Sequence, residues 1–135
     1  MIDNPLHLSR REDRETALAY LYEADMTSDA MEDVLERNHA DDDEYGYEIA
    51  TGAASAVGEL DELIDGVAED WTVSRMGGID RSILRMGVWE LVYSPNVPTT
   101  AVVSEAVALA NEYSTEKSAP FINGILVKLA STHRE

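Results

Sequence analysis

The chain has 135 residues, of which 44% are hydrophobic, and this composition suits one globular domain with a substantial core. It contains no cysteine, so disulfides and thiolate metal sites are excluded. The net charge of −17 is unevenly spread, because residues 23–70 hold 17 carboxylates and a single cation, Arg37. We expect this acidic middle to be a solvated surface that aids solubility, or one that repels polyanions and confines their binding to another side.

The first residues lack the apolar segment of a signal peptide. No apolar run approaches the 18 residues that a membrane-spanning helix requires. We therefore expect a cytoplasmic protein with no membrane partner.

Periodic apolar residues predict three helices in the first half of the chain. Ser9 and Glu12 have the spacing of a capping box, so the first helix should begin at Arg10. A short helix is predicted over 29–38, and a long one from about 44 to 68. The residues expected to face inward are Leu18, Leu21, Tyr22, Met31, Val34, Leu35, Tyr45, Ile49, Gly52, Ala53, Ala56, Leu60, Leu63, Ile64 and Val67. The small residues on the long helix would let another helix approach closely.

A short connector then precedes a fourth long helix. The connector contains Trp71 and ends at Gly77-Gly78, and the helix is predicted over 79–93. Prolines at 95 and 98 stop this helix. Trp71 and Trp89 fall on apolar stripes, so we expect both in the core or at an interface.

Two further helices are predicted in the last part of the chain. Thr99 or Thr100 can cap the first of them, and its apolar stripe runs from Val102 to Ala110. Within it, Glu105 is expected to be a buried or half-buried structural acid. The last helix contains residues 121–129. With no strand pattern anywhere in the sequence, the predicted fold class is all-α.

Several of these segments resemble the NusB family, the bacterial transcription antitermination factors that bind RNA. They are IDRSILRMGVWEL, VPTTAVVSEAVALA and PFINGIL between residues 79 and 126, and RREDRETALAYLY over 10–22. The resemblance implies an all-α bundle of about seven helices in two packed three-helix subdomains, forming a single domain over 1–135. It also implies binding of the boxA element of nascent ribosomal RNA transcripts jointly with the ribosomal protein NusE. That assembly helps RNA polymerase read through terminators.

Arg10, Arg11 and Arg14 fall within an arc of about 100° on the predicted first helix. Cations in a first helical turn work against the helix dipole by about 0.3–1 kcal/mol each. Two interpretations stay open. The arginines pair with the acidic middle of the chain, or they form a phosphate-binding face for RNA.

Asn123-Gly124 is unusual inside a predicted helix, because both residues disfavour helix interiors. In one interpretation, Gly124 permits tight helix–helix contact and Asn123 bonds a neighbouring backbone. In the other, Asn123 offers an amide to unpaired RNA bases and Phe121 offers a stacking face. The family resemblance favours the second, since family members place this FINGIL-like segment close to bound RNA.

The resemblance also implies a partner surface. An acid at the position of Asp80 and a tyrosine at the position of Tyr22 face NusE in NusB-like proteins. Lys117 replaces a frequently acidic position, a change that could affect either the RNA or the partner side, and we place it with the partner-binding residues. Arg81 and Arg85, one turn apart, are expected to form ion pairs within or between helices.

No enzymatic motif is present in the sequence. The three histidines are scattered without metal-ligand spacing, and residues 41–44 lack the alternating ligands and central glycine of a calcium loop. We expect no enzyme, no catalytic residue, no metal site and no cofactor. The alternative function is a helical protein-interaction module, either a homodimer or a partner adaptor, with weak or no RNA binding of its own.

Overall fold

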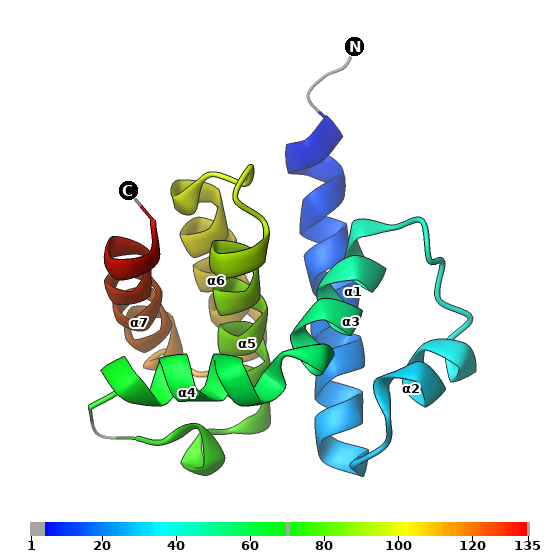
Figure 1. Ribbon diagram of the computed structural model, residues 1–135, viewed down its shortest axis with the longest axis horizontal. Coiled ribbons are helices and arrows are strands. Elements are labelled where there is room, and N and C mark those ends of the chain that lie inside the picture. Colours follow the sequence, from blue (N-terminus) through cyan, green and yellow to red (C-terminus); the bar gives the residue numbers. More distant parts are fainter. Residues whose placement is uncertain (1–4, 70, 135) are drawn as a thin grey trace.

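Seven α-helices and one 3₁₀ helix make up the computed structural model, which describes residues 5–69 and 71–134 (Figure 1). The α-helices are α1 (Pro5–Thr27), α2 (Met31–Arg37), α3 (Tyr45–Ser55), α4 (Val57–Val67), α5 (Gly78–Tyr93), α6 (Thr99–Tyr113) and α7 (Ser118–His133). The 3₁₀ helix, η1 (Val73–Arg75), lies between α4 and α5. No strand occurs in the described ranges, and the all-α prediction is confirmed.

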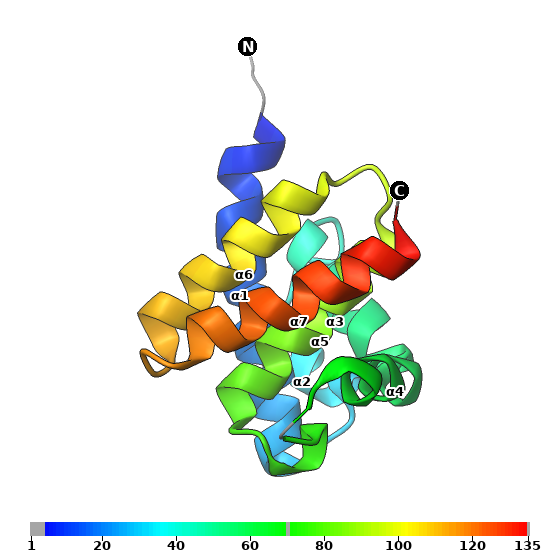
Figure 2. The ribbon, with the colours of Figure 1, turned by 90° about the vertical axis from the view of Figure 1, so that its left-hand side faces the viewer.

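The helices pack as two groups of three. The first group is α1, α2 and α3, and the second is α5, α6 and α7 (Figure 1). Both α1 and α3 also contact α5, which joins the groups, while α4 crosses from α3 to contact α5 and α7. Figure 2 shows α6 and α7 lying side by side. This arrangement confirms the predicted pair of three-helix subdomains.

The core is centred on α5, in which every residue from Met86 to Leu91 is buried. Helices α1, α3, α4, α6 and α7 all contribute apolar side chains to the same connected cluster. Its largest fully buried side chains include Ile49, Leu60, Ile64, Ile83, Leu84, Ile122 and Leu126. Because fully burying one such side chain contributes about 1.5–3 kcal/mol, this cluster fixes how the two groups sit together.

The first helix begins earlier than its sequence predicts. α1 starts at Pro5, so Ser9 lies inside the helix and the predicted start at Arg10 is wrong. Proline suits a first helical turn, since its missing N–H would have no partner there anyway. The arginines therefore lie in the second and third turns of α1, where the dipole penalty is smaller than at the terminus.

The long helix predicted over 44–68 is wrong as a single element. It is broken at Ala56, whose φ of −106° and ψ of 17° leave the helical region, and the two pieces are α3 and α4. The backbone N–H of Ala56 still bonds to the carbonyl of Gly52, and its own carbonyl accepts from Leu60. The break lets α3 pack on α1 while α4 turns toward α7, so the two pieces bury their apolar faces against different neighbours.

Gly52 confirms the expected close helix approach. A Cβ at this position would overlap the indole of Trp89, so α3 and α5 meet at this distance only because residue 52 has no side chain. Gly46 has a similar role toward α1, since a Cβ there would lie 2.7 Å from the backbone oxygen of Asp13. The small residues on α3 are therefore contact points between helices.

Arg134, near the end of the chain, holds the turn from α5 to α6 with hydrogen bonds. The N-cap of α6 is Pro98 and makes no side-chain cap bond, so the predicted threonine cap is wrong. Thr99 instead accepts a hydrogen bond from the Arg134 guanidinium at 3.2 Å. The same guanidinium donates at 2.5–3.0 Å to the carbonyls of Glu90, Leu91, Ser94 and Val97. A cation beside these carbonyls complements the negative end of the α5 dipole.

Candidate nucleic-acid and partner interface

Arg10 and Arg11 stand at the surface near the start of α1. The Arg10 guanidinium lies over the ring of Tyr45, 3.9 Å from its centroid, and has no carboxylate partner within the described part of the chain. Arg11 donates two hydrogen bonds to Glu105 of α6, at 2.9 and 2.8 Å, and 55% of its side chain is exposed. An exposed pair of this kind is worth about 0–1 kcal/mol, so Arg11 can exchange Glu105 for a phosphate at little cost.

Arg14 has a different environment from its two neighbours. Its residue is only 4% exposed, and its guanidinium makes two 2.8 Å hydrogen bonds to the buried carboxylate of Glu90 on α5. The phosphate contact expected of Arg14 does not fit this geometry, because its guanidinium is buried and bonded to Glu90 inside the protein. A pattern of helical spacing alone placed Arg14 with the surface arginines, whereas α5 covers that side of α1.

Tyr45 connects the buried pair to the surface. Its hydroxyl donates to Glu90 at 2.9 Å, and Ser94 lies at the same distance from it. Burial, followed by the negative charge of Glu90, raises the pKa of Tyr45 above its ordinary value. The ring is therefore held as a neutral, fixed platform on which Arg10 lies.

The proposed pairing of the arginines with the acidic middle of the chain is not what the structure shows for Arg11 and Arg14. Their partners, Glu105 and Glu90, lie outside residues 23–70. Glu105 is half-buried and engaged, as expected for a structural acid. These two arginines therefore leave the carboxylates of the acidic middle unneutralised.

A groove of about 330 Å³ opens where α7 begins. Trp71, Asp80, Lys117 and Phe121 line it together with two hydroxyl residues of the α6–α7 turn. The structure thus gathers residues that the sequence assigned to separate tasks. Trp71, which is 54% exposed, was missed as a site residue because it was expected in the core or at an interface. Its position in a connector that ends at Gly77-Gly78 was the available signal, since a connector residue has no helical stripe to join.

Asp80 is held in this groove by the turn that starts α7. One carboxylate oxygen accepts from Ser114 at 2.5 Å and the other from Ser118 at 2.8 Å. These bonds tie the first turn of α5 to the start of α7 and fix the groove's shape. The half-buried carboxylate remains a predicted partner contact.

Phe121 and Asn123 do not share a face of α7. Two residues correspond to about 200° of helix rotation, so they point to nearly opposite sides. Phe121 is half-buried in the groove, whereas Asn123 is exposed, and its amide has no hydrogen-bond partner among the described residues. A Cβ at Gly124 would meet nothing within 4 Å, so the interpretation of Gly124 as a tight helix contact is wrong. The two side chains must therefore contact different parts of any ligand.

Tyr22 and Met26 form an exposed apolar edge at the end of α1. Their residues are 37% and 50% exposed, and both side chains pack against Gly78 at the first turn of α5. Asp80 lies two residues further along the same turn. Tyr22 and Asp80, two of the three residues assigned to the partner side, are thus both placed around the start of α5.

Arg81 and Arg85 form ion pairs between helices, which confirms the expectation from their spacing. Arg81 bonds Asp25 of α1 at 2.6 and 3.1 Å and also donates to two carbonyls around η1. Arg85 bonds Asp61 of α4 at 2.9 and 2.8 Å. These half-buried pairs orient α4 and η1 and leave neither cation free for a ligand.

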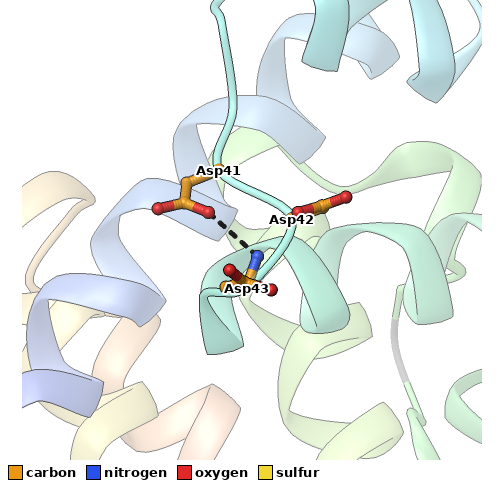
Figure 3. Close-up of side chains that lie close together, drawn as sticks. All are labelled: Asp41, Asp42 and Asp43. Atoms are coloured by element: carbon orange, nitrogen blue, oxygen red, sulfur yellow. Dashed lines mark hydrogen bonds between the residues drawn. The ribbon is translucent and has the colours of Figure 1, made fainter.

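Three exposed carboxylates gather in the loop before α3. Oxygens of Asp41, Asp42 and Asp43 lie within 4.8 Å of one another (Figure 3). One oxygen of Asp41 accepts from the backbone N–H of Asp43 at 3.0 Å, which forms a local turn. The cluster has the geometry of a solvated acidic turn and belongs to the acidic middle of the chain.

None of the described helices is both long enough and apolar enough to cross a membrane.

The comparisons with known proteins agree with this architecture. The model of the NusB family matches residues 11–131. The transcription antitermination protein NusB of Clavibacter michiganensis subsp. michiganensis is 38% identical over 133 residues, covering 92% of this chain and 97% of that protein. The NusB protein of Beutenbergia cavernae is 42% identical over 135 residues, covering 90% and 88% of the two chains.

Solved structures give the same result. NusB of T. maritima superposes with a TM-score of 0.84 at 28% identity, covering 93% of both chains. A chain from a crystal structure of the antitermination factors NusB and NusE with double-stranded RNA superposes with a TM-score of 0.78 at 27% identity, covering 92% and 97%. The chain belongs to the NusB family.

Proposed function

We propose that this protein is a transcription antitermination factor that binds boxA-type single-stranded RNA of nascent ribosomal transcripts together with NusE. In the antitermination complex it promotes read-through by RNA polymerase. It acts as a single domain over 1–135, without catalysis, in the cytoplasm. The observation that carries this proposal is the superposition, over 92% of the chain, on a protein crystallised with NusE and RNA.

The RNA contacts divide between the middle of α6 and its C-terminal end. Arg10 and Arg11 supply phosphate contacts beside the middle of this helix, where Arg11 meets Glu105. The groove with Phe121 lies beyond the other end, past Tyr113. From Glu105 to Tyr113 the helix rises about 12 Å at 1.5 Å per residue. A single strand crossing this distance has its backbone held at one end and a base stacked at the other.

Within the groove, the aromatic rings and the cation have complementary tasks. Phe121 and Trp71 offer faces on which an unpaired base stacks, a contact worth about 1–3 kcal/mol per base. Lys117 stands beside them, where its charge can meet a phosphate of the same strand or a carboxylate of the partner protein. Asn123 contacts the RNA from the nearly opposite face of α7.

NusE is proposed to contact the exposed edge at the start of α5. Tyr22 supplies the apolar anchor, Asp80 a carboxylate at its border, and Lys117 a cation that lines the same groove as Asp80. Because Asp80 and Lys117 also line the groove with Phe121, a partner bound there would border the RNA. This adjacency supports joint binding of the two ligands.

The test measures binding of a boxA-like RNA across a salt series, with and without NusE. Contacts from Arg10, Arg11 and Lys117 predict a log–log slope of about −2, at about −0.7 per contact. Changing Arg10 and Arg11 together to alanine should bring the slope to about −0.7. The matched control is Arg37→Ala, which removes an exposed cation from the acidic α2 side. Absence of salt-dependent binding in both conditions would refute RNA recognition.

The alternative is a protein-interaction module, as a homodimer or partner adaptor, that barely binds RNA alone. The observation that favours it is electrostatic, because the net charge is −17 and Arg11 is already paired with Glu105. Under this alternative, RNA binds only when NusE is present, and its salt slope is insensitive to Arg11. Sedimentation equilibrium of the chain alone decides whether a homodimer forms.

A further inference from the structure

The break between α3 and α4 opens a second groove, remote from the one at α7. Its volume is about 530 Å³. One wall consists of Gly52, Ala56 and Glu59 at the break, and the other of Trp89 and Tyr93 at the end of α5. We name it the α3–α4 groove. It shares no residue with the groove around Phe121, and nearly the whole length of α5 separates the two.

An aromatic stack forms the floor of the α3–α4 groove. The rings of Trp89 and Tyr93 lie 6.2 Å apart with an interplanar angle of 28°. Trp89 is buried and fixed against Gly52, whereas Tyr93 is 47% exposed. The indole N–H of Trp89 has no acceptor among the described residues. A large, rigid ring backed by a second ring is therefore presented to solvent.

A carboxylate lies beside this exposed ring. The hydroxyl of Tyr93 donates a hydrogen bond to one oxygen of Glu59, which holds the ring near α4. The second oxygen of Glu59 makes no hydrogen bond in the described part of the chain. An aromatic face and a partly free carboxylate at one position form the two halves of a site for a planar cation.

The segment around Glu59 is also negatively charged. Residues 44–69 contain seven carboxylates and no lysine or arginine, and two of these carboxylates pair with cations of other helices, Asp61 with Arg85 and Glu69 with Lys128. The potential over this face is therefore strongly negative, so it repels a nucleic-acid backbone and attracts a basic protein segment.

We propose that the α3–α4 groove docks an arginine-containing basic segment of a partner protein. The arginine guanidinium stacks on Tyr93 and pairs with Glu59, and the backbone of the segment accepts from the Trp89 indole. Arginine suits this position better than lysine, because its planar guanidinium can stack on the ring and donate two hydrogen bonds to the carboxylate at the same time. None of the residues that line this groove is assigned above to RNA or NusE, although Arg10 lies over Tyr45, whose ring centroid is 6.5 Å from that of Trp89. Because the test below contains neither RNA nor NusE, its outcome leaves that assignment untouched.

The test uses the full chain without RNA or NusE. A blocked glycine–serine peptide carrying two arginines is titrated to millimolar concentration while amide and indole signals are followed by NMR. We expect saturable shifts at Gly52, Glu59, Tyr93 and the Trp89 indole. The same peptide with citrulline, which keeps the shape and removes the charge, should bind at least about tenfold more weakly.

Variants of exposed residues separate stacking from general charge. Tyr93→Ala and Glu59→Gln should each weaken peptide binding by about three- to tenfold. Tyr113→Ala, at an equally exposed tyrosine on α6, and Glu62→Gln, at an exposed acid of α4, are the matched controls and should leave affinity unchanged. Equal binding of the citrulline peptide, equal effects of the Tyr93 and Tyr113 variants, shifts centred on residues 41–44, or no saturable binding would each overturn the proposal.

Discussion

Replacing Arg14 by alanine tests whether this arginine serves the core instead of the RNA. The side chains of Arg14 and Glu90 are 5% and 2% exposed, and two 2.8 Å hydrogen bonds join them. Removing Arg14 leaves the Glu90 carboxylate buried with the Tyr45 hydroxyl as its one remaining side-chain donor among the described residues. Breaking one partner out of such a pair costs about 3–5 kcal/mol. That is a large part of the roughly 5–15 kcal/mol that stabilises a typical domain.

The assay combines thermal and urea unfolding, both followed by circular dichroism, with RNA binding at a temperature where the variant stays folded. We expect Arg14→Ala to lower the midpoint of thermal unfolding by roughly 10 °C or more. Its RNA affinity and salt slope should match those of the unchanged chain. Arg11→Ala should behave in the opposite way, with a change in stability of about 1 kcal/mol or less and a weaker salt slope.

A paired variant controls for loss of packing. Changing Arg14 and Glu90 together to leucine removes both charges, and Tyr45 keeps Ser94 as a hydrogen-bond partner. Replacing both members of a buried pair by apolar residues is often neutral, so most of the lost stability should return. The reasoning is refuted if Arg14→Ala unfolds within about 1 kcal/mol of the unchanged chain, or if it loses salt dependence as Arg11→Ala does.

Three further predictions concern the helix packing, the Arg134 contacts and the buried network. Gly46→Ala should destabilise the chain by about 1–3 kcal/mol, because the added Cβ would meet the Asp13 backbone. The control Gly66→Ala, at a position with open space around it, should stabilise the chain by about 0.5–1 kcal/mol. Equal urea midpoints for the two variants would contradict this prediction. Arg134→Ala should lower the free energy of unfolding by about 2 kcal/mol and speed amide hydrogen exchange in the α5–α6 turn. Unchanged exchange there would show that the Arg134 hydrogen bonds do not stabilise this turn. The folded state raises the pKa of Tyr45, so the unfolding free energy should fall as pH rises above about 10, where the unfolded chain ionises first. Tyr45→Phe should remove that part of the pH dependence, which a pH series of urea unfolding measures.

Much of the fold was predictable, because the apolar stripes are local and regular. The helices predicted over 79–93 and 29–38 agree with α5 and α2 within one or two residues. The break at Ala56 was not predictable, since its sequence continues the same apolar period on both sides. It exists because α3 and α4 bury their faces against different helices, and the sequence does not record which neighbour each will meet.

The candidate site was predictable only in part, for the same reason. The exposed positions of Arg11 and Asn123 and the half-buried position of Arg10 over Tyr45 agree with the sequence-based hypothesis, and their RNA contacts stay predictions. Arg14 shares their helical arc, but α5 covers it. Trp71 shows the reverse, since an apolar residue expected in the core or at an interface stands half exposed beside Phe121.

The sequence by itself determined the all-α class and the segregation of acidic charge, because helix periodicity and composition are properties of contiguous residues. Tertiary structure alone decided which arginines are free, since burial of Arg14 depends on Glu90, which is 76 positions away along the chain. It also decided that Asp80, Lys117 and Phe121 line one groove and that Trp89 and Tyr93 line another. Both grooves lie where helices from distant parts of the chain meet, and such meetings are set by packing of the whole core.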